Sequence, residues 1–324
     1  MRFWTILLLC CALGFPGCGS SSDDSDGRLT LAVIPKGTSH EFWKSIHAGA
    51  IKAARELDVE IIWKGPQKED DREEQIKVVE NFIARRVNGI VLAPLDDTAL
   101  SRPVADATAE GIPVVIIDSG LDSDKQVSFV ATDNFKGGGL AAERLGALLG
   151  GTGKVVMLRY QEGSASTMAR EKGFMETLAA RFPEIEVISS NQYAGATTES
   201  AIQKAENILI RFAEIDGIFC PNESSTFGML RALQNAGRAG KLKFVGFDAS
   251  EKLAQALRAG ELHGLVLQNP FYMGELGVRT LVAHIKGGTV EKRLDTGVAL
   301  VTADNMDTPE IKALLYPDLD TWLK

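Results

Sequence analysis

Two aspartates occupy equivalent places in a pattern that the sequence contains twice. In each copy, an apolar strand beginning Gly-Ile is followed, after a connection, by a second apolar strand that stops at an aspartate, which is Asp118 in the first copy and Asp248 in the second. Open α/β sheets bind their ligands at the carboxyl ends of parallel strands. The repeat therefore predicts two similar lobes whose carboxylates face one cleft and accept hydrogen bonds from a ligand rich in hydroxyl groups.

The two aspartates also admit other interpretations. Taken alone, either one can be the N-cap of the helix that follows. As a pair they can be the acid and base of a glycosidase, in which two carboxyl groups stand about 5 to 9.5 Å apart. Their equivalent positions in the two copies favour ligand binding over both alternatives.

Adjacent aromatic residues follow the first predicted strand. Phe42 and Trp43 lie in IPKGTSHEFWKSI, at the start of a predicted helix. Rings at this place can offer flat apolar faces to the C–H side of a sugar ring, and a hydrophobic staple or packing between the lobes is the alternative. His40 is predicted to be a helix N-cap neighbour or a hydrogen-bonding group, because no second histidine lies at metal-ligand spacing.

Three polar residues mark the second half of the chain. Arg170 lies in the early turns of a predicted helix, where it can donate two hydrogen bonds to neighbouring hydroxyls or form a surface ion pair with Glu171 or Glu176. Asn222 directly follows a strand and a proline, so it is either a ligand amide or a turn residue. Gln268 ends the last strand of the predicted second lobe, where it can serve both a hinge and a ligand.

The elements that must hold these residues alternate along the chain. From Leu29 onward, short β-branched runs alternate with long runs of period 3.6, which is typical of βαβ units and a parallel sheet. The strands are continuous apolar runs, as expected when helices cover both faces of the sheet. The predicted strands are 29–34, 60–63, 89–92, 114–117, 127–130, 154–158, 186–190, 217–220, 243–247 and 262–267.

A helix and a further strand region remain after the two lobes are complete. This surplus predicts that the chain recrosses between the lobes, which would then open and close about a hinge. The fold class expected is α/β, with two Rossmann-like lobes, each built on a parallel sheet, joined by a multi-crossing hinge. The first lobe is predicted to comprise 29–131 and about 269–295, and the second 132–268 and about 296–324.

Composition and missing motifs exclude several functional classes. The 324 residues are 45% apolar and carry a net charge of −8 without a basic block, which argues against binding to nucleic acid. The sequence contains no G-x-S-x-G, H-E-x-x-H or C-x-x-C motif, and LGGTGKV lacks the glycine spacing of a phosphate loop. We therefore expect no enzyme activity, no cofactor and no metal.

The N-terminus is predicted to direct export. Residues 1–18 read as a signal peptide and 19–27 as a flexible tether rich in Gly, Ser and Asp. The segment FPGC resembles a bacterial lipoprotein signal, in which Cys18 would be acylated, and ordinary cleavage nearby is the alternative. The body then keeps one cysteine, Cys220, and forms no internal disulfide.

Taken together, these segments resemble the sugar-binding periplasmic receptors of ABC importers, in the ribose-binding subgroup, over residues 29–301. The family's Asn-Pro-aromatic-aromatic segment matches 40–43, and its Asp-Arg pair matches Asp118 and Ser119. The resemblance implies the type I periplasmic binding protein fold. It also implies a ligand site made of His40, Phe42, Trp43, Asp118, Ser119, Arg170, Tyr193, Asn222, Asp248 and Gln268.

Departures from the family pattern bear on the ligand. Ser119 stands where the ribose receptors have an arginine, and losing a charged donor costs about 1.5 to 3 kcal/mol. Lys36, with Asp118 and Ser119, is also similar to receptors for the furanosyl quorum-sensing signal. LacI-type repressors share the fold but begin with a helix-turn-helix, in whose place this chain has the predicted export signal.

The resemblance implies a periplasmic solute-binding protein. We expect it to capture a monosaccharide or similar polyol by lobe closure and to deliver it to an ABC permease. The alternative function is a periplasmic sensory receptor for a sugar or for the furanosyl quorum-sensing signal. A membrane association through the lipid anchor is expected in either case.

Overall fold

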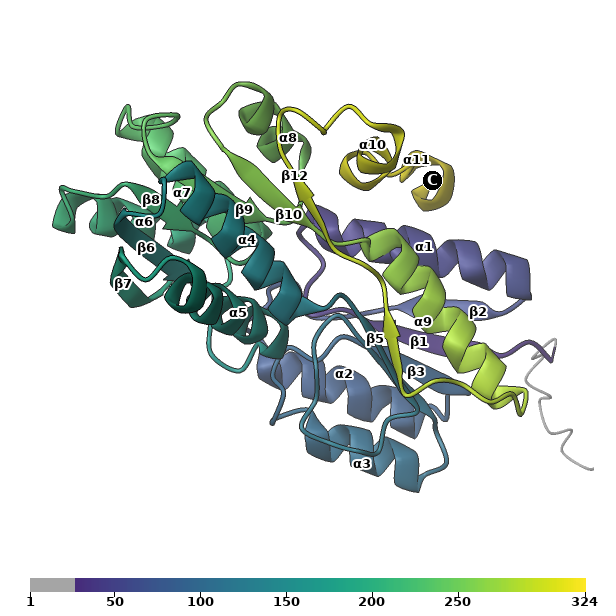
Figure 1. Cartoon of the computed structure of the whole chain (residues 1–324). Helices are drawn as coiled ribbons and strands as arrows, with labels where there is room; N and C mark the ends of the chain where they lie inside the picture. Colours follow the sequence, from purple (N-terminus) through teal and green to yellow (C-terminus); the bar gives the residue numbers. More distant parts are fainter. Residues whose placement is uncertain (1–26) are drawn as a thin grey trace, which may run out of the picture.

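The computed structural model describes residues 27–324 and contains two six-stranded sheets (Figure 1). The strand orders are β11-β5-β4-β3-β1-β2 and β12-β10-β9-β8-β6-β7, and every pairing is parallel except that of β10 with β12. The predicted signal peptide, Cys18 and the tether up to residue 26 lie outside the described residues. We call the first sheet with its covering helices the first lobe, and the second sheet with its helices the second lobe.

The chain builds the first lobe and then the second. The first lobe takes β1 (Thr30–Ile34), α1 (Glu41–Leu57), β2 (Glu60–Trp63), α2 (Arg72–Ala84), β3 (Gly89–Leu92), α3 (Ser101–Ala109), β4 (Val114–Ile117) and β5 (Ser128–Ala131). The second takes α4 (Asn134–Leu148), β6 (Gly153–Arg159), α5 (Ala165–Arg181), β7 (Ile185–Tyr193), α6 (Thr198–Arg211), β8 (Gly217–Phe219), α7 (Glu223–Asn235), β9 (Lys243–Phe247), α8 (Glu251–Arg258) and β10 (Gly264–Leu267). All ten predicted strands are present, with ends shifted by up to a few residues.

The remaining segments recross between the lobes. The elements after β10 are α9 (Pro270–Ile285), β11 (Arg293–Asp295), β12 (Ala299–Val301), α10 (Pro309–Leu315) and α11 (Asp320–Leu323). Helix α9 and strand β11 return to the first lobe, while β12 joins the second sheet. The chain therefore crosses between β5 and α4, between β10 and α9, and between β11 and β12.

The last residues divide between the lobes. Helix α10 packs on the core of the second lobe, as expected, through the buried Leu315. Helix α11 lies instead against α1 of the first lobe, where Trp322 faces Arg55 and Phe271. The C-terminal segment 304–324, which we call the strap, thus reaches from one lobe to the other (Figure 1).

Apolar strand residues form the core on both faces of each sheet. Every residue of β3, β4, β9 after its first residue, and β10 is buried. Helices α1 and α9 cover one face of the first sheet and α2 and α3 the other, and helices α4 and α5 pair similarly in the second lobe. Helices therefore bury the strands on both faces of the sheets, as the continuous apolar runs predict.

Close helix packing explains the glycine run at residues 137–139. A side chain at Gly138 would collide with the carbonyl oxygen of Arg170 on α5, so only glycine allows α4 and α5 to approach this closely. This packing fixes the early turns of α5 at the edge of the cleft, and with them the Arg170 side chain.

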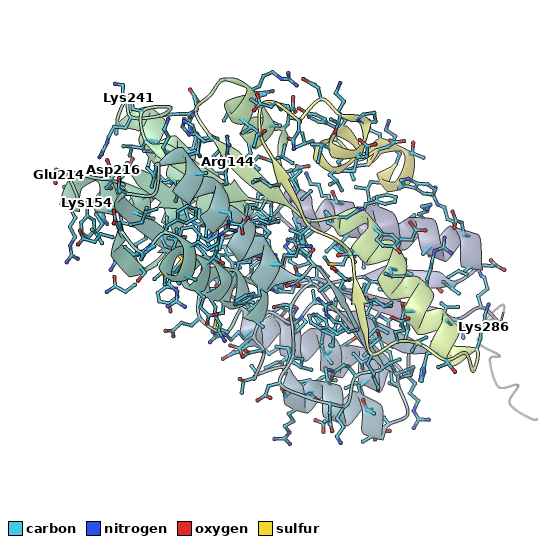
Figure 2. All side chains as sticks on the ribbon, viewed as in Figure 1. Arg144, Lys154, Glu214, Asp216, Lys241 and Lys286 are labelled. Atoms are coloured by element: carbon cyan, nitrogen blue, oxygen red, sulfur yellow. The ribbon has the colours of Figure 1, made fainter. Side chains whose placement is uncertain are left out.

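Some charged side chains lie at the two ends of the molecule. Lys154, Glu214 and Asp216 lie together at the outer end of the second lobe, and Lys286 lies at the opposite end of the first (Figure 2). Lys154 donates to Glu214 at 2.5 Å. Among residues 27–324, no helix is both long and apolar enough to span a membrane.

Candidate ligand-binding site between the lobes

A small cavity, of about 30 Å³, lies between the carboxyl ends of the two sets of strands. Eight of the ten predicted site residues line it, and they come from both lobes. These eight are His40, Phe42, Trp43, Asp118, Arg170, Asn222, Asp248 and Gln268. The remaining lining residues are Lys36, Glu69, Tyr160, Ser164, Ser166, Thr167 and Glu223.

The two aspartates of the sequence repeat have the same unusual backbone. Asp118 follows β4 with φ 62°, and Asp248 follows β9 with φ 67°. Asparagine and aspartate are the residues other than glycine that most readily adopt this left-handed conformation. The turn directs both carboxylates into the space between the lobes, where Asp118 and Asp248 are almost fully buried.

Asp248 is the centre of a polar network in the second lobe. Its Oδ1 accepts from Gln268 Nε2 at 2.7 Å and its Oδ2 accepts from the backbone N–H of Glu223 at 3.1 Å. Arg170 Nη1 lies 3.7 Å from Oδ2. Burial raises the pKa of the Asp248 carboxyl, and the charge of Arg170 and the hydrogen bond from Gln268 oppose this rise.

Arg170 is a buried donor held from several sides. It is 2% exposed, donates Nε to Asn134 Oδ1 at 2.8 Å and Nη1 to the carbonyl of Pro221 at 2.9 Å, and stacks over the Phe247 ring. The alternative surface pair with Glu171 or Glu176 is not formed. Glu171 accepts instead from Arg159 at 2.7 Å, and Glu176 pairs with Lys172. The predicted position of Arg170 at the cleft is therefore observed.

Lys36 supplies a cation to the first lobe. Its Nζ lies 3.0 Å from Asp118 Oδ2 and donates to the hydroxyls of Ser164 and Ser166, each at 3.2 Å. This corrects the expectation that Ser119 leaves the site short of one charged donor. Ser119 itself does not line the cavity, and its hydroxyl accepts from the Ser166 backbone N–H at 3.0 Å across the lobes.

Glu69, which sequence reasoning missed, joins several of the predicted residues. His40 Nδ1 lies 2.6 Å from its Oε1, and Trp43 Nε1 donates to the same oxygen at 2.8 Å. Tyr160 of the second lobe donates to Oε2 at 2.7 Å. The available signal was position: Glu69 lies in the connection after β2, at the same sheet edge as the other site residues.

The charges of this cluster shift the pKa values of His40 and Glu69. Burial opposes the positive charge of His40, but the hydrogen bond and charge of Glu69, with smaller contributions from Glu223 and Asp248, raise the pKa of His40 to about 9. For Glu69, burial favours the neutral acid, but bonding to His40, Trp43 and Tyr160 outweighs it and lowers the pKa. His40 is thus a charged partner of Glu69.

The aromatic pair divides its roles. Phe42 and Trp43 meet edge to face with ring centroids 5.0 Å apart. Trp43 is almost fully buried and packs into the core of the first lobe, which differs from the alternative of packing between the lobes, while Phe42 is partly exposed. The backbone N–H of Phe42 donates to Glu223 Oε2 at 3.3 Å across the lobes. Burial raises the pKa of Glu223 to about 7, although the charge of His40 opposes this rise.

Asn222 combines its two expected roles. It is the N-cap of α7, where its Oδ1 accepts from Ser225, and its side chain also lines the cavity. Cys220, at the end of β8, is buried and contributes to the core of the second lobe. Within the described part of the chain, no group of three His, Cys, Asp or Glu residues is arranged to hold a metal ion.

Tyr193 is, with Ser119, one of the two predicted site residues that do not line the cavity. It ends β7, an edge strand, where its ring lies under the Arg159 guanidinium and its hydroxyl donates to Glu162 at 3.2 Å. At this place Tyr193 does not line the cavity. Tyr160, which follows the inner strand β6, lines the cavity in its place.

Hydrogen bonds between the lobes hold the cleft closed. The Asp97 backbone N–H donates to the Gly163 carbonyl at 2.9 Å, and Gln161 Nε2 donates to the Glu69 carbonyl at 2.7 Å. Inside the closed cleft, the buried Gln268 Oε1 has no hydrogen-bond partner among the described residues. A buried acceptor without a partner is costly, so this oxygen is positioned to accept a hydrogen bond from a ligand.

Two lobes that close over a cavity lined with charged donors and acceptors define a ligand-binding protein. The chain belongs to the periplasmic binding protein family, because residues 31–289 match the family described as the periplasmic binding protein domain. Among curated relatives, the D-allose-binding periplasmic protein of Escherichia coli K12 is 31% identical over 270 residues, which are 80% of this chain and 85% of that protein. The ribose import binding protein RbsB of Bacillus subtilis is 27% identical over 297 residues, 91% of this chain and 95% of that protein.

Solved structures support the same assignment. A carbohydrate transporter solute-binding protein from Agrobacterium radiobacter, in complex with D-arabinose, has a TM-score of 0.87 and 34% identity, covering 90% of this chain and all (100%) of that one. An ABC transporter solute-binding protein from Agrobacterium vitis with bound D-fucose has a TM-score of 0.86 and 37% identity, covering 89% of this chain and 100% of that one.

These comparisons confirm the predicted fold class and the predicted family of sugar-binding transport proteins, which are not enzymes. Membership of the family also supports the predicted periplasmic location.

Proposed function

We propose that this protein captures a monosaccharide or a similar polyol between its lobes and presents the closed complex to an ABC permease. The observation that carries the proposal is that each lobe brings one aspartate and one buried cation to the same cavity. Lys36 pairs with Asp118 and Arg170 with Asp248. Carboxylates accept and cations donate in charge-assisted hydrogen bonds. Because each hydroxyl both donates and accepts, the four groups together can bind several hydroxyls.

The remaining groups favour a sugar over a simple anion or an amino acid. Asn222 and Gln268 add amides, and Gln268 Oε1 offers a buried acceptor that needs a donor. Phe42 adds an apolar face against which ring C–H groups can pack. The relatives bind D-allose and ribose by name, and the solved neighbours hold D-arabinose and D-fucose. All four are polyhydroxylated aldoses of one ring.

Closure is the step that the proposed ligand would drive. Donors and acceptors from both lobes reach one ligand only when the cleft is closed, so the ligand has a higher affinity for the closed form and shifts the population toward it. The permease would then distinguish the loaded protein by its closed shape.

An N-terminal lipid anchor is proposed to keep the protein at the membrane. Acylation of Cys18 would leave residues 19–27 as a spacer before β1. A mature N-terminal peptide that carries no acyl mass would refute the anchor.

The function is tested by thermal shift and calorimetry against pentoses, hexoses, polyols and the furanosyl signal. A ligand at one hundred times its Kd stabilises the native protein by about 2.7 kcal/mol, so a true ligand gives a clear shift in Tm. Lys36→Met should weaken binding of that ligand tenfold to a hundredfold, since a hydrogen bond to a charged group contributes about 1.5 to 3 kcal/mol.

Lys172→Met is the matched control, because Lys172 is an exposed lysine on α5 outside the cavity. It should bind like the wild type. Absence of any shift across the panel, or equal affinity in Lys36→Met and wild type, would contradict the proposed site.

A further inference from the structure

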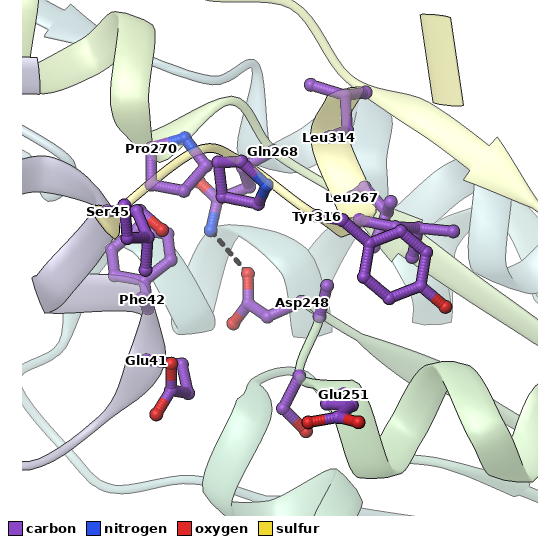
Figure 3. A pocket seen from close by; sticks show the side chains of 15 residues that line it. Glu41, Phe42, Ser45, Asp248, Glu251, Leu267, Gln268, Pro270, Leu314 and Tyr316 are labelled. Carbon is purple, nitrogen blue, oxygen red and sulfur yellow. Dashed lines mark hydrogen bonds between the residues drawn. The ribbon is translucent and has the colours of Figure 1, made fainter. Parts of the chain in front are cut away.

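A second cavity, of about 280 Å³, lies beside the ligand cavity (Figure 3). Its walls come from the start of α1, the turns that follow β9 and β10, and the strap. We call it the side chamber. It is larger than the ligand cavity, which measures about 30 Å³, and its volume is close to the lower end of the range for small-molecule sites.

Three residues line both cavities. Phe42, Asp248 and Gln268 face the ligand cavity on one side and the side chamber on the other. The hydrogen bond from Gln268 Nε2 to Asp248 Oδ1 forms part of this shared wall (Figure 3). Gln268 is 3% exposed and its Oε1 lacks a partner within residues 27–324, so the wall itself contains an acceptor that a ligand can use.

The strap forms the outer wall of the side chamber. Its first half is fixed to the second lobe, where Asp307 forms a two-point ion pair with Arg258 at 3.0 Å and Leu315 is buried in the core. Its end is fixed to the first lobe by Trp322 against Arg55. Between these anchors, Tyr316 lines the side chamber. The chamber is therefore bounded by both lobes in the closed form.

The lining of the side chamber combines the groups that bind a sugar ring. Tyr316 is an aromatic side chain that is 47% exposed, and Figure 3 shows it across the chamber from Phe42, with Asp248 between them. Glu41 and Glu251 add carboxylates to the lining (Figure 3). Aromatic faces suit ring C–H groups, and a carboxylate has spare lone pairs for hydroxyl donors.

We propose that the side chamber is a second ring subsite, so that the ligand class includes disaccharides and aryl glycosides as well as free monosaccharides. This inference rests on the proposed sugar-binding function. The first ring occupies the ligand cavity, the link passes the shared wall at Asp248 and Gln268, and the second ring lies between Phe42 and Tyr316.

The test compares free and substituted sugars by isothermal titration calorimetry on the intact protein. The probes are free aldopentoses and aldohexoses, their α- and β-para-nitrophenyl glycosides, and the common disaccharides. We expect at least one substituted sugar to bind as tightly as its free parent or more tightly. Tyr316→Ala should weaken that substituted ligand by roughly tenfold through the lost aromatic contact and leave the free sugar unchanged.

Tyr272→Ala is the matched control. Tyr272 is a similarly exposed tyrosine, at 42%, on α9, and it lines neither cavity. Its substitution should change neither affinity.

Three results would overturn the second subsite. If free sugars bind and no substituted sugar does, the chamber takes no second ring while the proposed function stands. If Tyr316→Ala weakens free and substituted ligands equally, the second ring lies elsewhere. If no sugar of either kind binds, the proposed function fails together with the subsite.

Discussion

At the scale of single residues, the site depends on buried charges that neutralise one another in pairs. Lys36 with Asp118, Arg170 with Asp248, and His40 with Glu69 all lie in one cavity. Removing one member of such a pair leaves an uncompensated buried charge, which is strongly destabilising. The pairs therefore hold the cavity in shape and at the same time present hydrogen-bonding groups to a ligand.

The His40–Glu69 pair gives a pH dependence whose sign is defined. The pKa of His40 rises from 6.5 in the unfolded chain to about 9 in the folded protein. The stabilisation is therefore fully present below pH 6.5 and is lost as the pH rises through 9. A shift of this size corresponds to about 3 kcal/mol at most.

We expect His40→Gln to destabilise the protein most at pH 6 and progressively less toward pH 9.5, because glutamine carries no proton to lose. Urea unfolding of both proteins across this range measures the difference in the free energy of unfolding. His284→Gln, an exposed histidine at the end of α9, controls for loss of a histidine as such. A difference that stays constant with pH would argue against the charged pair.

At the scale of elements, the strap connects the lobes independently of the three crossings. Helix α10 belongs to the second lobe and α11 contacts the first. The contact of Trp322 with Arg55, at 5.5 Å, and with Phe271, at 6.5 Å, is made while the lobes are closed. If opening separates α11 from α1, this contact favours the closed form.

We expect Trp322→Ala to weaken sugar binding about two- to fivefold, which corresponds to a cation–π contact of about 0.5 to 1 kcal/mol. Calorimetry with the sugar found in the panel measures it. Ile210→Ala, which truncates an 82% exposed side chain on the second lobe, should have no effect. An unchanged affinity in Trp322→Ala would show that α11 stays in place when the lobes open.

At the scale of the whole molecule, closure brings together two lobes that each have a hydrophobic core of their own. Each lobe has its own sheet and its own buried clusters. The contacts across the cleft are hydrogen bonds of polar side chains and loop backbone, such as Glu69 with Tyr160. Water can replace such bonds at small net cost, so the lobes can separate without unfolding.

Small-angle scattering tests this motion directly. We expect the radius of gyration of the free protein to decrease on saturation with the bound sugar, because the ligand selects the closed form. A sugar that gave no thermal shift should leave the radius unchanged. An equal radius with and without the true ligand would contradict ligand-driven closure.

The sequence by itself determined the strands, the repeat that gives two lobes, and the places of Asp118 and Asp248. These features follow from local periodicity and from the rule that parallel strands bring their carboxyl ends to one edge. They were predictable because each depends on residues close together in the chain.

Only the tertiary structure decided which side chains meet in the cleft. Lys36 reaches hydroxyls 128 and 130 residues away, and Glu69 meets Tyr160 across 91 residues. Such contacts depend on how the lobes close, which no local pattern encodes. The same holds for Tyr193, whose place on an edge strand removes it from the site, and for the strap, whose end packs on the opposite lobe.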